Sequence, residues 1–132
     1  MNILTKLKDG KYSILASNGY YSFDRGIKPI MDKLNENINY FKGLEVADKV
    51  VGKASAILLS LSGIKKVVCI TLSKSAKKVL DEHNIAYEYE ELTDVIINHK
   101  GDDVCPMEKA VLDVDDFEKA YQILKQKYEY KW

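Results

Sequence analysis

The stretch "ADKVVGK" brings one acidic and two basic side chains close together in the sequence. We predict that it belongs to a helix over residues 43–63, "GLEVADKVVGKASAILLSLSG", which Gly63 ends. In one interpretation Asp48 stabilises the first turn, and Lys49 and Lys53, one turn apart, extend into water. In the other, the helix is a pocket wall, with Asp48 as an acid, a base or a ligand-binding carboxylate and Lys53 as an anion clamp or a tuned amine.

The stretch "CPMEK" places a thiol beside a second predicted helix start. With Pro106 as the first helical residue, Cys105 is the expected N-cap and Glu108 takes the third position of a capping box. The helix dipole and Lys109 favour the thiolate of Cys105, whereas the negative charge of Glu108 disfavours it. Cys105 is therefore either a reactive cysteine or a small buried cap.

Several further polar residues could bind a ligand or a metal. Arg25 and Lys28 precede a predicted helix start in "DRGIKP", which is a natural place for an anion. Residues 99–105 contain one histidine, two aspartates and one cysteine, but their spacing matches no common zinc signature and fits a solvated turn. We therefore predict neither a metal nor a cofactor. Cys69 lies in "VVCI" and is expected to be a core residue.

Composition limits the classes of function that the chain can have. Its 132 residues correspond to one domain over residues 1–132. Twenty basic and twenty acidic side chains give no net charge, which makes nucleic acid an improbable partner. No apolar stretch is long enough to span a bilayer, and the first residues lack the features of a signal peptide. With no disulfide-like spacing, both cysteines are expected to be reduced thiols of a cytoplasmic protein.

The periodicity of apolar residues predicts the elements that must position these side chains. A hairpin with an Asp-Gly turn is expected first, followed by two helices, a buried strand, a helix, one or two strands and two helices. These elements are expected at residues 2–19, 26–41, 43–63, 64–72, 73–84, 85–98, 105–112 and 115–130. The order predicts an α/β fold, a three-layer α/β/α sandwich with a mixed sheet in which the hairpin is antiparallel and crossovers link the rest.

Three segments together resemble a known family. "RGIKPIMDKL", "GLEVADKVVGKASAILL" and "GDDVCPMEKAVL", in this order, are similar to segments of a small group of uncharacterised prokaryotic proteins with a cytidine-deaminase-like fold. In that fold, as the resemblance implies it, one helix opens with His/Cys-Ala-Glu and a second opens with Pro-Cys-x-x-Cys. A zinc ion bound by these residues activates water, and the glutamate transfers protons.

The sequence departs from the deaminase pattern at each zinc ligand. The first motif aligns with Ala47-Asp48-Lys49, and the second aligns with "LSKSAKK" around Ser73 and Ser75. Zinc-dependent deamination is therefore not expected. The resemblance still implies a pocket at the two helix N-termini, toward which Asp48, Lys49, Lys53, Ser73 and Ser75 would point. We expect Cys105, Glu108 and Lys109 to reach the same pocket.

Three functions are compatible with these residues. The first is binding of a small nucleotide-like or phosphorylated ligand by helix N-termini and lysines. The second is a zinc-free enzyme with Cys105 as nucleophile or redox thiol and with Asp48 and Lys53 in proton transfer and anion stabilisation. The third is a homo-oligomeric interaction protein, because nine tyrosines and the terminal "YEYKW" supply aromatic surface.

Overall fold

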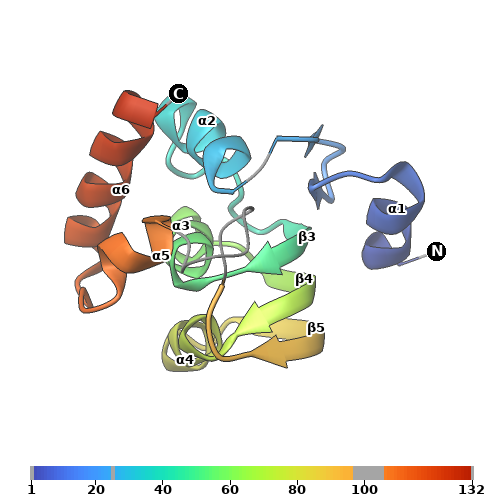
Figure 1. Ribbon diagram of the computed structural model, residues 1–132. Coiled ribbons are helices and arrows are strands. Elements are labelled where there is room, and N and C mark those ends of the chain that lie inside the picture. The colour runs from blue at the N-terminus through green and yellow to red at the C-terminus, as the bar shows by residue number, and fades with distance from the viewer. Residues whose placement is uncertain (1, 25, 97–105, 132) are drawn as a thin grey trace.

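The structure is a computed structural model that describes residues 2–24, 26–96 and 106–131, with side chains up to residue 128 (Figure 1). Helices and strands alternate along most of this part of the chain. The elements are α1 (Ile3–Gly10), β1 (Ile14–Ala16), β2 (Tyr21–Ser22), α2 (Lys28–Glu36), β3 (Glu45–Val51), α3 (Lys53–Ser62), β4 (Lys66–Ser73), α4 (Lys74–Glu82), β5 (Ala86–Thr93), α5 (Pro106–Val111) and α6 (Phe117–Lys131).

The strands form one mixed sheet of five strands in the order β2-β1-β3-β4-β5. Strand β1 is antiparallel to β2 and to β3, whereas β3, β4 and β5 run parallel to one another. Because α3 follows β3 and α4 follows β4, both helices begin at the same edge of the sheet, where neighbouring parallel strands end. The predicted α/β class and mixed sheet are confirmed.

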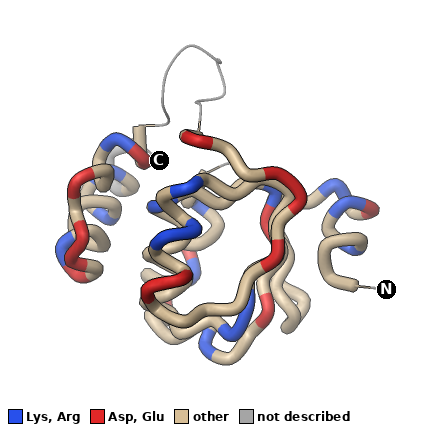
Figure 2. The backbone as a smooth tube through the Cα atoms, turned by 90° about the horizontal axis from the view of Figure 1, so that it is seen from below, with Lys and Arg blue, Asp and Glu red and all other residues tan. Residues whose placement is uncertain are grey.

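Helices lie on both sides of this sheet. Figures 1 and 2 show α1 on one side of β3, β4 and β5, while α3, α5 and α6 lie on the other. Helix α3 is the centre of the larger helical layer, since α2, α4, α5 and α6 all pack against it. Seven successive residues, from Lys53 to Leu59, are buried in α3. A helix that is buried all round lacks the one-sided apolar stripe of a surface helix.

The predicted helix over residues 43–63 is wrong in its first half. Glu45–Val51 is strand β3, and the helix begins only at Lys53, with Gly52 as its N-cap residue. Three of these seven residues are valine, and β-branched side chains fit a pleated sheet better than a helix. Asp48 and Lys49 therefore lie on a strand, and Lys49 is not one helical turn from Lys53. Gly63 does end the helix, in the left-handed conformation with φ 83°.

The predicted N-terminal hairpin is also wrong. Ile3–Gly10 is a helix, and the Asn2 side chain caps it by accepting from the Thr5 N–H at 2.8 Å. The Asp-Gly pair thus lies at the end of a helix, where Lys11 adopts the left-handed conformation with φ 58°. The hairpin forms later, between β1 and β2. An N-terminal cap and a fully buried Leu7 outweigh the turn preference of Asp-Gly.

Most later elements agree with the sequence. Pro29 lies in the first turn of α2, and Cys69 on β4 is fully buried. In α4 the buried residues are Ala76, Val79 and Leu80, which form the inward face of the helix. At the start of α6, the Asp116 carboxylate accepts from the Lys119 N–H at 3.1 Å. Within the described ranges, no helix combines the length and apolar character that crossing a membrane requires.

Candidate functional site

The start of α3 holds a carboxylate that comes from α5. Glu108 Oε1 accepts from the Lys53 N–H at 2.7 Å, and Oε2 accepts from the Ala54 N–H at 2.8 Å. The first N–H groups of a helix have no partner within the helix and attract negative charge. Gly52 permits the close approach, since a Cβ there would lie 2.4 Å from the carboxyl group. Glu108 is therefore a tightly fitted internal anion at the N-terminus of the central helix.

Glu108 was predicted to close a capping box within its own helix. Its carboxylate instead caps α3, with partners 54 and 55 residues away in the sequence. Cys105, the predicted partner in that box, lies outside the described residues. The local capping signal at Glu108 thus belongs to a long-range contact between two helices.

The Lys53 side chain makes a second attachment to the same region. Its ammonium donates to the Leu112 carbonyl at 2.9 Å and lies 3.7 Å from the Asp115 carboxylate. Lys53 is only 7% exposed, whereas the Asp115 side chain is 97% exposed, so the carbonyl is the stronger partner. Lys53 therefore contacts both Glu108 in α5 and the turn that follows α5.

Burial changes the pKa of the Glu108 carboxyl group. Desolvation raises the pKa of Glu108, while the Ala54 and Lys53 N–H groups and the Lys53 charge act in the opposite direction. A buried carboxylate that accepts two backbone hydrogen bonds is partly compensated for its lost hydration. The same two N–H groups and the ammonium could stabilise the anionic part of a ligand.

Asp48 is a separate buried acid on β3. It lies opposite Cys69 of β4 in the sheet register and is 8% exposed. Burial raises the pKa of Asp48 to about 8, against weaker opposing effects of the Val50 and Lys49 N–H groups and the Lys49 charge. Desolvation and the charge of Asp48 raise the pKa of the Cys69 thiol to about 12. Asp48 can therefore donate a hydrogen bond near neutral pH, while Cys69 is not a thiolate.

The N-terminus of α4 carries the two candidate serines. Ser73 is buried and its hydroxyl accepts from the Ala76 N–H at 3.1 Å, as an N-cap residue does. The Ser75 hydroxyl lies 3.3 Å from that of Ser73. The two hydroxyls thus form a small polar cluster at the edge where β4 ends, beside the start of α3.

The structure brings the predicted site residues together only in part. The Lys53 N–H contacts Glu108, and the Ser73 hydroxyl contacts that of Ser75. Lys53 is not among the described residues that shift the pKa of Asp48. Lys49 is exposed and, as the next residue of the strand, points away from Asp48. Lys109 is exposed on α5. Arg25 and Cys105 lie outside the described residues.

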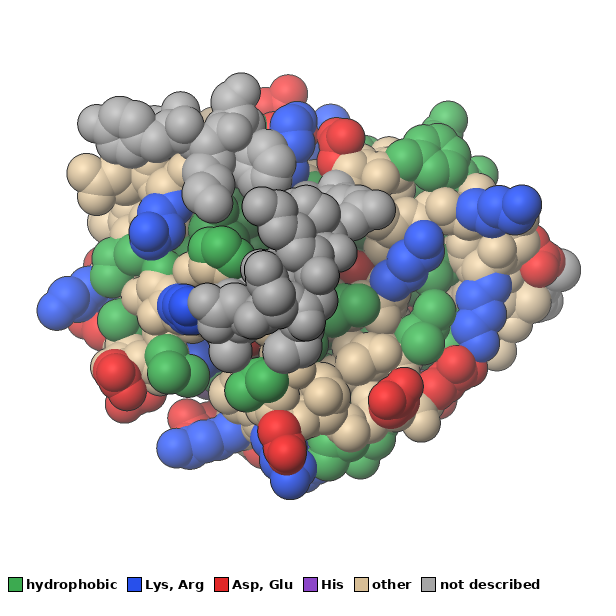
Figure 3. Space-filling view, in the orientation of Figure 1, with side chains coloured by type: hydrophobic (Ala, Val, Ile, Leu, Met, Phe, Trp, Pro, Cys, Tyr) green, Lys and Arg blue, Asp and Glu red, His purple; other side chains and the backbone are tan. Residues whose placement is uncertain are grey.

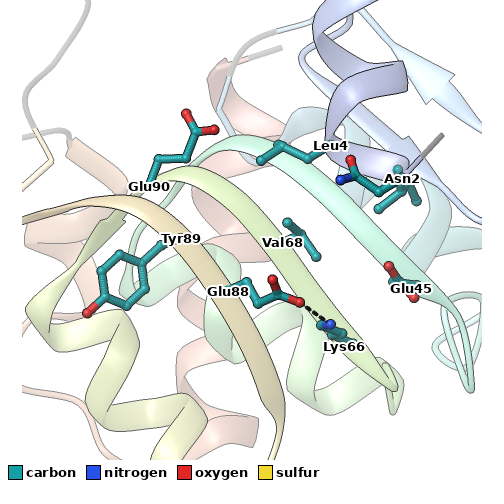
Figure 4. A pocket seen from close by; sticks show the side chains of 9 residues that line it. Asn2, Leu4, Glu45, Lys66, Val68, Glu88, Tyr89 and Glu90 are labelled. Atoms are coloured by element: carbon teal, nitrogen blue, oxygen red, sulfur yellow. Dashed lines mark ion pairs between the residues drawn. The ribbon is translucent and has the colours of Figure 1, made fainter.

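Surface hollows lie elsewhere on the described part of the molecule. One of about 290 Å³ lies between α1 and the sheet; it is lined by Asn2, Ile3, Leu4, Glu45, Lys66, Val68, Glu88, Tyr89 and Glu90 (Figure 4). A second, of about 530 Å³, is lined mainly by residues of α6 together with Ile38 and Leu61. Neither is lined by a predicted site residue. Figure 3 shows acidic and basic side chains intermixed on the face toward the viewer.

Sequence reasoning missed the groups that complete the site at α3. The N–H groups of Lys53 and Ala54 and the carbonyl of Leu112 are backbone atoms, which no residue type reveals. Gly52 was the available signal, since a glycine directly before an apolar helix permits close approach of another group. Among the described residues, no three His, Cys, Asp or Glu side chains gather closely enough to hold a metal ion.

Comparisons with known proteins agree on one family. A family model described as a domain of unknown function, DUF1893, matches residues 2–128 of the chain. The crystal structure of a DUF1893 family protein (TM1506) from Thermotoga maritima has a TM-score of 0.86 against this structure. The two sequences are 29% identical over 94% of this chain and 86% of that one. No curated protein matches the sequence.

Proposed function

Since the chain belongs to the DUF1893 family of domains of unknown function, we propose a function from its own residues: zinc-free binding of a small nucleotide-like or phosphorylated ligand. The site lies at the start of α3, with the start of α4 beside it. Lys53 N–H, Ala54 N–H and the Lys53 ammonium receive the anionic group of the ligand. Glu108 occupies this position in the unliganded protein.

The proposal includes a cytidine-deaminase-like fold. Its support is that α3 and α4 begin directly after the neighbouring parallel strands β3 and β4, which agrees with the plan of two motif helices that the resemblance implies. In that plan the two helix N-termini lie together at the carboxyl ends of parallel strands. Ligands of α/β proteins bind at the carboxyl ends of the strands. Gly52-Lys53-Ala54, rather than Ala47-Asp48-Lys49, then stands where the first deaminase motif would open the helix.

One observation carries the proposal: the start of α3 already binds a carboxylate through two N–H groups, at 2.7 and 2.8 Å. Two converging donors and a buried ammonium suit a phosphate oxygen at least as well as a carboxylate, because a phosphate carries more negative charge. The ligand must displace Glu108, so its affinity is lowered by the free energy that this contact contributes. Ser73 and Ser75 supply hydroxyls for the remainder of the ligand.

A thermal-shift screen with nucleoside monophosphates and sugar phosphates tests this function. A ligand at about 100 times its Kd stabilises the folded protein by about 2.7 kcal/mol, which raises Tm by several degrees. Lys53→Met should abolish the shift, because it removes the ammonium but keeps an unbranched apolar chain. Lys65→Ala, at an exposed lysine, is the control and should retain the shift. An unchanged Tm with every phosphorylated compound would exclude the proposed function.

A further inference from the structure

We propose that α5 is a latch that the Glu108 carboxylate fastens to the start of α3, and that α5 detaches when another anion takes the place of this carboxylate. This inference rests on the proposed function and adds its regulation: ligand binding and release of Pro106–Val111 become one event. It assigns Glu108 the role of an internal competitor for the ligand.

The hydrogen bonds that join α5 and the residue after it to α3 meet at one point, while α5 also packs against α6. Glu108 binds the N–H groups of Lys53 and Ala54, and the Lys53 ammonium donates to Leu112, which directly follows the helix. Both contacts originate from two adjacent residues at the start of α3. An anion placed there competes with Glu108 for the N–H groups and with Leu112 for the ammonium, so it weakens both contacts together.

Apolar packing alone holds α5 weakly. The helix has six residues, of which Met107 and Val111 are its buried apolar side chains. Leu112 is 56% exposed and adds little to the packing. A helix of this length is unstable in isolation because nucleation is unfavourable, so its order depends on tertiary contacts. Loss of the Glu108 contact is therefore expected to leave the segment held by Met107 and Val111 and to make its opening more frequent.

Release of α5 leaves the remaining fold in place. Helix α6 packs on α3 and α2 as well as on α5 (Figure 1). Its Ala120 and Leu124 are fully buried. The Tyr128 hydroxyl also donates to Asp32 of α2. The structure thus places the short helix α5, which polar contacts help to hold, directly before the longer helix α6. Local opening of α5 requires such a difference between the two helices.

Hydrogen exchange of the full-length protein tests the latch. In Glu108→Ala the amides of residues 107–112 should exchange about tenfold faster or more, while those of α6 around Leu124 should keep their wild-type rates. Glu91→Gln, at an exposed acid, is the control and should leave both segments unchanged. Glu108→Gln retains one acceptor oxygen and should give an intermediate rate, which keeps the test valid if Glu108→Ala folds poorly.

Acetate distinguishes the latch from a purely structural cap. In Glu108→Ala, acetate should raise Tm relative to sodium chloride at equal ionic strength, because it fills the vacated donors at α3. It should not slow exchange in residues 107–112, because acetate is not attached to α5. Wild-type exchange rates for residues 107–112 in Glu108→Ala and Glu108→Gln would overturn the latch. The screen with wild-type protein tests the proposed function separately, since it measures Tm and not hydrogen exchange in residues 107–112.

Discussion

Gly52, the N-cap residue of α3, and Glu108 of α5 lie so close that a Cβ at position 52 would be 2.4 Å from the carboxyl carbon of Glu108. The backbone at Gly52, with φ −100°, suits any residue, so the cost of a side chain here is steric. We predict that Gly52→Ala destabilises the protein by about 1–3 kcal/mol, measured by urea unfolding.

A double-mutant cycle identifies the cause of this loss. In the Glu108→Ala background the extra methyl group has space, so Gly52→Ala should cost at least about 1 kcal/mol less than in the wild type. Additive effects of the two substitutions would show that the contact between Gly52 and Glu108 does not determine the stability of this site.

Lys53 is predicted to contribute through the Leu112 carbonyl rather than through Asp115. Lys53→Met should lower the free energy of unfolding by about 1–3 kcal/mol, because it leaves a partly buried carbonyl without its donor. Asp115→Asn should leave the urea midpoint unchanged, because the Asp115 side chain is almost fully exposed and lies 3.7 Å from the ammonium. Equal losses in the two variants would contradict this assignment.

Asp48 should make stability fall as the pH rises. Burial raises its pKa to about 8, so between about pH 4, its value in the unfolded chain, and pH 8 the folded state holds a proton that the unfolded state has released. The contribution is fully present below this range and is lost through it, with a slope of up to about 1.4 kcal/mol per pH unit.

Asp48→Asn tests this pH dependence. The raised pKa of Glu108 acts in the same direction, so the variant should show a shallower fall rather than none. Urea unfolding at several pH values from 5 to 9 should show Asp48→Asn gaining stability relative to the wild type as the pH rises, up to about pH 8. Parallel curves for the two proteins would contradict a buried acid with a raised pKa.

The two cysteines are predicted to differ in reactivity. Cys69 is fully buried with its thiol pKa raised to about 12, so iodoacetamide should not modify it in the folded protein at pH 7.5. In one of the two interpretations of the sequence, Cys105 reacts as a thiolate with a pKa below its ordinary value. Peptide mapping after labelling across a pH series measures both sites. A labelling midpoint for Cys105 near pH 8.5 would exclude the zinc-free enzyme in which Cys105 acts as nucleophile or redox thiol.

The sequence was sufficient for elements whose periodicity is clear. Strand β4 is rich in β-branched residues, and α4 has one apolar stripe, so both could be predicted closely. The boundary between β3 and α3 could not, because α3 is buried all round and its first residues continue the apolar pattern of the strand. The sequence indicated Glu108 as a candidate site residue, but its hydrogen-bond partners lie 54 and 55 residues away in the chain. Local patterns do not encode such pairings.

Titration of the isotope-labelled protein with a sugar phosphate, followed by the amide resonances of Lys53 and Ala54, tests anion binding at the start of α3 most directly. We predict that these two resonances shift on binding and that those around Leu124 in α6 stay in place. The resonances of residues 107–112 should change together with them as α5 is released. Lys53 and Ala54 resonances that remain unmoved at saturating sugar phosphate would contradict a ligand site at this helix N-terminus.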